Sequence, residues 1–518
     1  MSNKKWLLTL VLLLVMMTAA AQGVALQRGC RRGIPHSHQQ LHRSQRAQHQ
    51  PGGNFYTGDR RQLVVLVSFG DLLFNEGSNE TALLQKWDKI FNQEGYNEGN
   101  YVGSVRDYFT AQSYGKFRLA FDLLYVHLDA EHKKYRSDDY DENSQYLVDD
   151  IMAELLKRDI DWSQYDWNGD KFVNQLLIVF AGYGQNDGGD TNTIWAHQWW
   201  LSEHLNLKDP TGKTYREADS FLYNGVEYTV DCYCAVAEKG KSKATFGTIC
   251  HEYTHCFGMP DFYFGNATYV ASWDLMDNGN YNGGGYCPAG YSAHERWLMG
   301  WLTPTELRDA ATVTRMEALG DSPQAYMVRN SGYADEFYFI ENRQQSGWDE
   351  KLPGSGILVF HIDYVPAIWA GTEEPPNHPS YKDPQTGKSY AATSRYVIFH
   401  ANDNSSASYG YAYWAYPYLN NDELTDESSP VASLWHPNFE GTYLMQKPLT
   451  NMDVENGLAS FDFMGGTAGV EALSAEPSAA AARIYDLSGR QLSGEADMQA
   501  GGIYIIRYAD GQSRKVAR

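Results

Sequence analysis

Two histidines separated by three residues, His251 and His255, carry the clearest chemical signal in the sequence. On a helix, residues four apart lie on one face with Cβ atoms ~5–6 Å apart, so two such imidazoles can bind one zinc ion. Glu252 follows the first histidine and can hold a water molecule beside the metal. Asp261 lies on the returning chain after Gly258, a residue type that ends helices readily. The spacing therefore predicts a zinc site with a carboxylate base.

Such a site suits the hydrolysis of an amide bond. A zinc ion with three protein ligands keeps an open position, lowers the pKa of water there and polarises a carbonyl group. Glu252 would take the proton from that water and pass it to the leaving amine. Tyr263 can either donate a hydrogen bond to the oxyanion or pack as an ordinary aromatic side chain. Met276, in a short turn after the motif, would form an apolar floor beneath the metal.

The third metal ligand has two candidates. Asp261 follows His255 at the spacing of the extended zinc-protease motif, and we expect it to be the ligand. Glu295 is the alternative third zinc ligand, on a predicted helix over residues 291–301. A glutamate from a downstream helix would complete the other common zinc-protease geometry.

The order of strand-like and helix-like windows around these residues predicts a mixed α/β (α+β) catalytic domain over residues 55–305. Strand-like windows alternate with helix-like ones, as in α/β proteins. The strand-like windows are 62–69, 117–128 and 176–181, and the helix-like windows are 104–109, 145–156 and 245–257. The metal motif falls in the last helical window.

The pattern becomes β-like after the catalytic domain. Residues 306–465 predict an all-β sandwich that packs on the catalytic domain. Residues 466–482 are rich in small side chains and predict a linker, and residues 483–518 predict a small β module.

The N-terminal 54 residues differ from the rest. Residues 1–21 have the charged start, apolar run and small-residue cleavage site of a secretory signal peptide. Residues 22–54 predict an irregular pro-segment and hence a zymogen. Cys30 lies among arginines that would favour its thiolate, which could occupy the open zinc position and keep the enzyme latent. The alternative is a linker with an incidental cysteine.

Oxygen-bearing side chains alternate in a stretch before the second apolar strand. They are Asp166, Asn168, Asp170 and Asn174. Such a set can converge on Ca²⁺ as in an EF-hand loop, or it can form an ordinary polar turn. The loop lacks the usual glycine at its sixth place and the glutamate at its twelfth.

Five of the six cysteines cluster in sequence around the metal motif: Cys232, Cys234, Cys250, Cys256 and Cys287. In an exported protein they can form disulfides that brace the metal helix, with Cys234–Cys250 and Cys256–Cys287 as one pairing. They can equally remain buried thiols, because spacing alone does not determine pairing.

Charge and hydropathy exclude other classes. The formal net charge of −22 argues against a nucleic-acid partner, since nothing would neutralise phosphates. Beyond the N-terminal apolar run, no stretch is long and apolar enough to suggest a transmembrane anchor.

Several segments carry a resemblance to a known family. They are residues 248–263, 272–277, 295–301, 341–344 and 356–363. In these segments the chain resembles the immune-inhibitor-A-like family of secreted metalloproteases, over roughly residues 60–465. The resemblance implies a zinc endopeptidase with a metzincin-like catalytic domain. The pattern Gly258-x-Pro260-Asp261-x-Tyr263 is also similar to that of small secreted metzincin-like proteases in which the aspartate is a ligand.

The C-terminal residues carry a second resemblance. Residues 484–490, 501–506 and 515–516 are similar to the sorting domains of the type nine secretion system of Gram-negative bacteria. This implies an outer-membrane secretion machinery as partner and a secreted or cell-surface protein. The alternative is a small structural appendage.

The sequence thus predicts a secreted zinc-dependent endopeptidase that acts on proteins or peptides. One rival is a surface binding protein or adhesin on an inactive protease fold, but both histidines and Glu252 are intact. Another is a zinc-dependent hydrolase of non-peptide amides, which the extended motif and the export signal disfavour.

Overall fold

The computed structural model describes residues 55–136, 143–201, 220–369, 394–403 and 410–466, together with shorter stretches at 376–377, 381–382, 389–390 and 469–471 and the C-terminal strands. The predicted signal peptide and the pro-segment with Cys30 lie outside the described residues. Contacts divide the chain into two units, Met1–Val470 and Glu471–Arg518, and each is described by itself.

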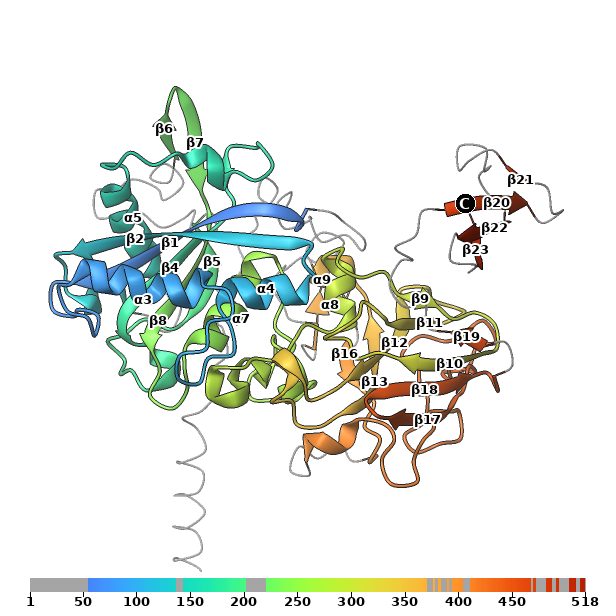
Figure 1. Ribbon diagram of the computed structural model, residues 1–518. Helices are drawn as coiled ribbons and strands as arrows, with labels where there is room; N and C mark the ends of the chain where they lie inside the picture. Colours follow the sequence, from blue (N-terminus) through green and yellow to red (C-terminus); the bar gives the residue numbers. More distant parts are fainter. Residues whose placement is uncertain are drawn as a thin grey trace, which may run out of the picture. The chain divides into compact units, whose positions relative to one another are not determined.

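A five-stranded sheet forms the centre of the N-terminal region, in the order β2-β1-β4-β8-β5 (Figure 1). Its strands are β1 (Gly58–Phe69), β2 (Phe117–Leu128), β4 (Leu176–Tyr183), β5 (His197–Trp200) and β8 (Cys232–Lys239). Strands β2, β1, β4 and β8 run parallel, and β5 is antiparallel at one edge. The three strand-like windows of the sequence therefore form strands as predicted.

Helices cover both faces of this sheet. They are α3 (Glu80–Asn92), α4 (Val105–Gln112), α5 (Ser144–Leu155) and α7 (Phe246–Cys256). Along β1, Val64 and Leu66 enter the core shared with α3, α4 and α7, whereas Val65 and Val67 enter the core shared with α5. A parallel sheet buried on both faces explains why β1 is a continuous apolar run rather than an alternating one. The mixed α/β fold is confirmed.

The region after residue 300 contains two further sheets. The first has the order β16-β13-β12-β11-β9, and the second β17-β18-β10-β19. The strands of the first are β9 (Thr305–Glu306), β11 (Tyr326–Arg329), β12 (Glu336–Arg343), β13 (Gly356–Asp363) and β16 (Tyr396–Ile398). Those of the second are β10 (Ala311–Met316), β17 (Leu449–Glu455), β18 (Leu458–Phe463) and β19 (Gly469–Glu471).

Strand β12 packs in two directions at once. Its Phe337 and Phe339 enter the same core as α7, and its Tyr338 and Ile340 enter a core shared with β18 residues such as Phe461. This alternation follows from the two-residue period of a strand. The first sheet therefore lies between the catalytic region and the second sheet.

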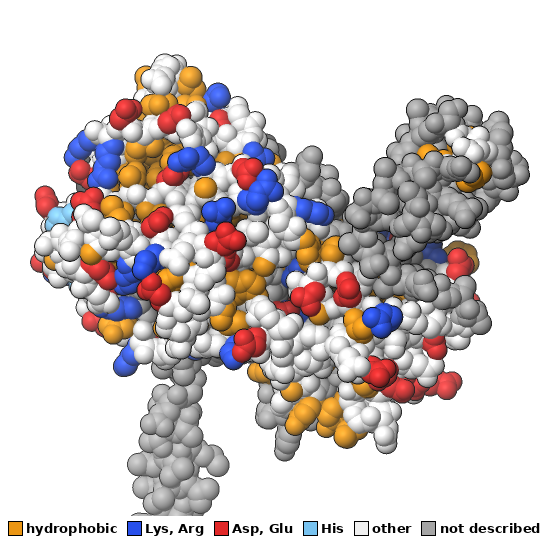
Figure 2. Space-filling view, viewed as in Figure 1, with side chains coloured by type: hydrophobic (Ala, Val, Ile, Leu, Met, Phe, Trp, Pro, Cys, Tyr) orange, Lys and Arg blue, Asp and Glu red, His pale blue; other side chains and the backbone are white. Residues whose placement is uncertain are grey.

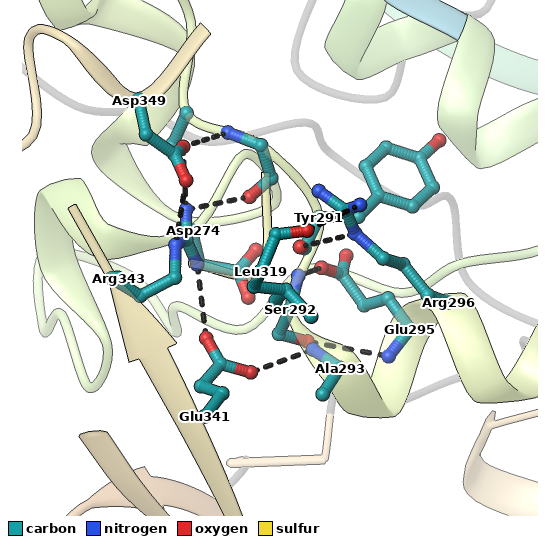
Figure 3. Close-up of polar contacts among 12 residues, drawn as sticks. Asp274, Tyr291, Ser292, Ala293, Glu295, Arg296, Leu319, Glu341, Arg343 and Asp349 are labelled. Atoms are coloured by element: carbon teal, nitrogen blue, oxygen red, sulfur yellow. Dashed lines mark hydrogen bonds and ion pairs between the residues drawn. The ribbon is translucent and has the colours of Figure 1, made fainter. Parts of the chain in front are cut away.

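A buried polar cluster also joins β12 to the helix α8 (Ala293–Leu298), as Figure 3 shows. Glu341 Oε2 accepts the backbone N–H of Ala293 at 2.6 Å. Arg343 donates to both oxygens of Asp349 at 2.8 and 2.7 Å, and Asp349 accepts the N–H of Gly290 at 2.8 Å. These contacts fix the start of α8 against β12.

The remaining elements are short. A three-stranded sheet of β3 (Phe172–Val173), β7 (Val226–Val230) and β6 (Ser220–Tyr223) belongs to the N-terminal region, and α9 (Pro366–Trp369), β14 (Tyr381–Lys382) and β15 (Ser389–Tyr390) follow β13. The C-terminal unit holds an antiparallel sheet, in the order β21-β20-β22-β23, of β20 (Ala481–Asp486), β21 (Gln491–Leu492), β22 (Ile503–Tyr508) and β23 (Ser513–Ala517).

Acidic and basic side chains are mixed over the surface of the N-terminal region, on the face that Figure 2 shows. Within the described part of the chain, no helix combines the length and apolarity that a bilayer crossing requires. The most exposed large apolar side chains there are Phe439 and Leu419, in the long connection between β16 and β17.

Candidate active site

Helix α7 places the two histidines and the glutamate of the motif in the protein interior. His251, Glu252 and His255 are all buried. The helix ends at Cys256, and Gly258 then turns the chain with a φ of +86°. A positive φ of this kind is open to glycine and strained for most other residues. The turn directs the following segment back toward the histidines and so brings Asp261 to them.

Each imidazole is oriented by a backbone carbonyl. His251 Nδ1 lies 2.9 Å from the Leu275 carbonyl oxygen, and His255 Nδ1 lies 2.6 Å from that of Met259. A carbonyl can only accept, so both Nδ1 atoms carry a proton, and in the neutral rings both Nε2 atoms keep a lone pair. This is the tautomer in which histidine binds a metal, and such partners fix ligand orientation.

The two Nε2 atoms converge on one carboxylate oxygen. Asp261 Oδ1 lies 3.3 Å from His251 Nε2 and 3.0 Å from His255 Nε2. Ligand atoms at zinc bond lengths of ~2.0–2.1 Å in a tetrahedron lie about 3.3 Å apart. The observed separations match that edge length, so these three side chains fit a zinc ion.

The polar atoms of the site lack other partners. Glu252 Oε2, His255 Nε2 and Asp261 Oδ1 are buried and make no hydrogen bond. Buried polar atoms are normally satisfied, and the convergence of these three forms a donor set that suits a metal ion. Glu252 also comes within 4.8 Å of both imidazoles. Of the two carboxylates, Asp261 is the one with an oxygen within 3.3 Å of both Nε2 atoms.

The charges of the site shift one another's pKa values. Burial lowers the pKa of His251, but the adjacent Asp261 carboxylate and the charge of Glu252 outweigh it and raise that pKa to about 9. Burial raises the pKa of Asp261, but the charge of His255 and the adjacent His251 imidazole hold it well below its usual range. Burial raises the pKa of Glu252, against the opposing charges of the two histidines. A carboxyl with a raised pKa suits a group that takes and returns a proton near neutrality.

A cleft of about 520 Å³, partly open to solvent, lies against His251 and Glu252. Its other walls include Asn186, Trp195, Thr248, Tyr263, Asn280 and Tyr281. Tyr263, a predicted site residue, thus reaches the cleft. Tyr281 was not predicted. Its ring lies 3.4 Å from the Lys243 ammonium, and the only sequence signal for it was an aromatic residue shortly after the methionine turn.

The turn that contains Met276 packs beside helix α7. Met276 is fully buried in the same core as Ile249 of α7. Its N–H donates to Asp274 Oδ1 at 2.8 Å, and its carbonyl accepts the N–H of Phe262 at 2.9 Å. The turn is therefore tied to the segment that carries Asp261.

Glu295 is not brought to the histidines. Its Oε2 accepts the N–H of Ser292 at 2.7 Å and its N–H donates to Ser292 Oγ at 3.2 Å, which is the capping box of α8. Burial and the charge of Asp274 raise the pKa of Glu295 well above its ordinary value. A neutral carboxyl in a helix cap is a poor metal ligand.

The predicted calcium residues form a turn whose oxygens accept backbone N–H groups. Asp166 Oδ1 accepts from Gly169 and Asp170 at 2.8 and 3.0 Å. The Asn174 side-chain oxygen accepts the Trp167 N–H at 2.6 Å, and Asn168 donates to Asp170 at 2.9 Å. The polar-turn interpretation accounts for these bonds, and calcium binding stays a prediction.

The five cysteines in the described part of the chain are free thiols. The structure does not form the predicted pairs. Burial and the neighbouring Cys232 and Cys234 raise the pKa of Cys256 well above its usual value, and Cys287 donates to the Trp348 carbonyl at 3.3 Å. Cys232 and Cys234 lie two apart on β8 and face α7, a juxtaposition that sequence spacing does not reveal.

Residues 55–300 match the family model described as immune inhibitor A peptidase M6, catalytic domain. The chain is a metallopeptidase. It hydrolyses peptide bonds, and the His-Glu-His cluster of α7 is its metal-capable group. The match ends at residue 300 and so excludes the sheets that follow. No curated protein matches the chain.

Proposed function

We propose that the metallopeptidase is a secreted zinc-dependent endopeptidase in which His251, His255 and Asp261 hold the metal and Glu252 moves the proton. One observation carries the proposal: three buried ligand atoms from these residues converge, with Asp261 Oδ1 3.0 and 3.3 Å from the two imidazole nitrogens. A water-activating carboxylate lies within 4.8 Å of the imidazoles.

The mechanism follows from the roles of these side chains. Zinc, when bound, supplies Lewis acidity that favours ionisation of water and charge on the scissile carbonyl. Glu252 accepts the proton of the attacking water at Oε2, which has no other partner, and delivers it to the leaving amine nitrogen. Tyr263, in the cleft wall, donates a hydrogen bond to the oxyanion of the tetrahedral intermediate.

The proposal is tested by hydrolysis of casein or a peptide library by purified protein, with and without a chelator. Activity should vanish with the chelator and return with added zinc. Glu252→Gln should bind zinc and cleave roughly 10²–10⁴-fold more slowly. Chelator-resistant cleavage, or turnover by Glu252→Gln equal to wild type, would contradict the mechanism.

The finer architecture and the export route are part of the same proposal. We infer a metzincin-like catalytic domain over residues 55–305 and a β-sandwich over residues 306–465, supported by the core that the two later sheets share. Residues 1–21 direct export, residues 22–54 with Cys30 keep the enzyme latent, and residues 483–518 engage the outer-membrane machinery. Deletion of residues 483–518 should retain the protein inside the outer membrane, and Cys30→Ser should activate the precursor. Normal release of the truncated protein would contradict the sorting role.

A further inference from the structure

Strand β16 lies outside the matched family region. Its first residue, Tyr396, nevertheless contacts segments that hold the proposed metal ligands in place. The Tyr396 ring stacks on that of Phe262, with centroids 3.9 Å apart and planes 25° from parallel. Phe262 directly follows the proposed ligand Asp261. Tyr396 is fully buried, so solvent does not reach this contact.

The Tyr396 hydroxyl touches the other segment that supports the ligands. It lies 3.0 Å from Asp274 Oδ2 and 2.7 Å from Ser292 Oγ. The hydroxyl is placed to donate to either oxygen, and its single proton serves one of them at a time. Asp274 Oδ1 in turn accepts the N–H of Met276 at 2.8 Å. The hydroxyl thus holds the carboxylate that shapes the methionine turn.

The methionine turn orients one ligand directly. The Leu275 carbonyl lies 2.9 Å from His251 Nδ1, and so sets the ring's tautomer and direction. Tyr396 is therefore linked to His251 by way of Asp274 and Leu275. It is linked to Asp261 by way of Phe262.

Asn377, also after residue 300, hydrogen-bonds both Phe262 and Tyr396. Its side-chain nitrogen lies 2.8 Å from both the Phe262 and the Tyr396 carbonyl oxygens, and its oxygen accepts the Tyr396 N–H at 2.9 Å. The backbone after Asp261 is thereby attached to β16. Without β16, the two segments that position the ligands would lose a common support.

We propose that Tyr396 is a positioning residue of the metal centre, so that the region after residue 300 completes the active site. This inference rests on the proposed zinc site. Partners behind metal ligands commonly change metal affinity by 10–100-fold when they are removed. Tyr396 acts one step further out but on two ligands at once.

The test compares two buried tyrosines that each lose only a hydroxyl. Tyr396→Phe keeps the stacked ring and removes the bond to Asp274. Tyr338→Phe, on the neighbouring strand β12, removes a buried bond of 2.6 Å to the Ser433 carbonyl, away from the metal segments. Zinc affinity by chelator competition and the visible absorption spectrum of the Co²⁺-loaded protein are measured, with thermal unfolding of the metal-free proteins.

Tyr396→Phe should weaken zinc binding by roughly 10-fold or more and shift the Co²⁺ spectrum, whereas Tyr338→Phe should lower thermal stability alone. Wild-type affinity and spectrum in Tyr396→Phe would overturn the inference. If Tyr396→Phe does not fold, Asp274→Asn replaces it and should shift the spectrum in the same way; an unchanged spectrum there would equally overturn it. Failure of the wild type itself to bind zinc would refute the proposed function instead.

Discussion

Two buried polar clusters in this molecule differ in one respect. Around Arg343, every guanidinium nitrogen meets an acceptor on Asp349, Glu341 or the Gly290 carbonyl (Figure 3). Around the histidines of α7, Glu252 Oε2 and Asp261 Oδ1 meet none. The side chains of both clusters are buried, but the second cluster lies against a cleft that is partly open to solvent. A satisfied cluster stabilises a fold, and an unsatisfied one is arranged for a ligand that arrives later.

The third ligand gives the largest expected effect. Asp261→Ala should lose zinc and all peptidase activity, because two imidazoles alone hold the ion weakly. Glu295→Gln, at the rival position, should keep zinc because that side chain caps α8. Metal content and activity of the two purified proteins decide between them. Zinc loss in Glu295→Gln with retention in Asp261→Ala would reverse the assignment.

The general base comes next. Glu252→Gln should lower kcat by roughly 10²–10⁴-fold, the usual contribution of acid–base catalysis. Because Glu252 Oε2 has no partner to lose, the metal-free variant should unfold at or above the wild-type temperature. A large loss of stability would show that Glu252 stabilises the fold, as the hydrogen-bonded residues around Arg343 do.

The oxyanion donor is expected to contribute less. Tyr263→Phe should lower kcat by roughly 10²-fold, the lower end for loss of one oxyanion donor, with little change in KM. Tyr281→Phe, across the same cleft, serves as the matched control. If only the Tyr281 variant loses kcat, the donor is Tyr281 and Tyr263 merely packs.

The satisfied cluster should respond in stability rather than in chemistry. Arg343→Met leaves two buried carboxylates without their cation and should lower the free energy of unfolding by about 3–5 kcal/mol in urea denaturation. Arg329→Met, which removes a part-exposed ion pair with Glu306 at 3.2 Å, should cost under about 1 kcal/mol. Equal small losses in both proteins would contradict the contrast between the two clusters.

The sequence predicted what depends on local spacing. The pair His251 and His255, the returning Asp261 and the turn at Met276 lie within one short stretch, and the structure places them together. The apolar windows of β1, β2 and β4 were equally readable, because a strand buried on both faces leaves a continuous run. Short-range pattern and helix geometry suffice for such features.

Long-range contacts were not predictable in this way. Nothing in the spacing of Tyr396, Glu341 or Arg343 indicates that they reach the segments around α8 and the methionine turn. The same limit applies to the cysteines, where the neighbours of Cys256 come from β8 rather than from the nearest thiols in sequence. Glu295 was a reasonable ligand by residue type, and only its capping bond to Ser292 shows its role.

The central claim is that His251, His255 and Asp261 share one zinc ion, and anomalous X-ray scattering at the zinc absorption edge from crystals of the purified protein tests it most directly. We expect one strong peak about 2.0–2.2 Å from both Nε2 atoms and from the Asp261 carboxylate. A peak near Glu252 or Glu295 rather than Asp261 would contradict the claim. The absence of a peak at these histidines in active protein would also contradict it.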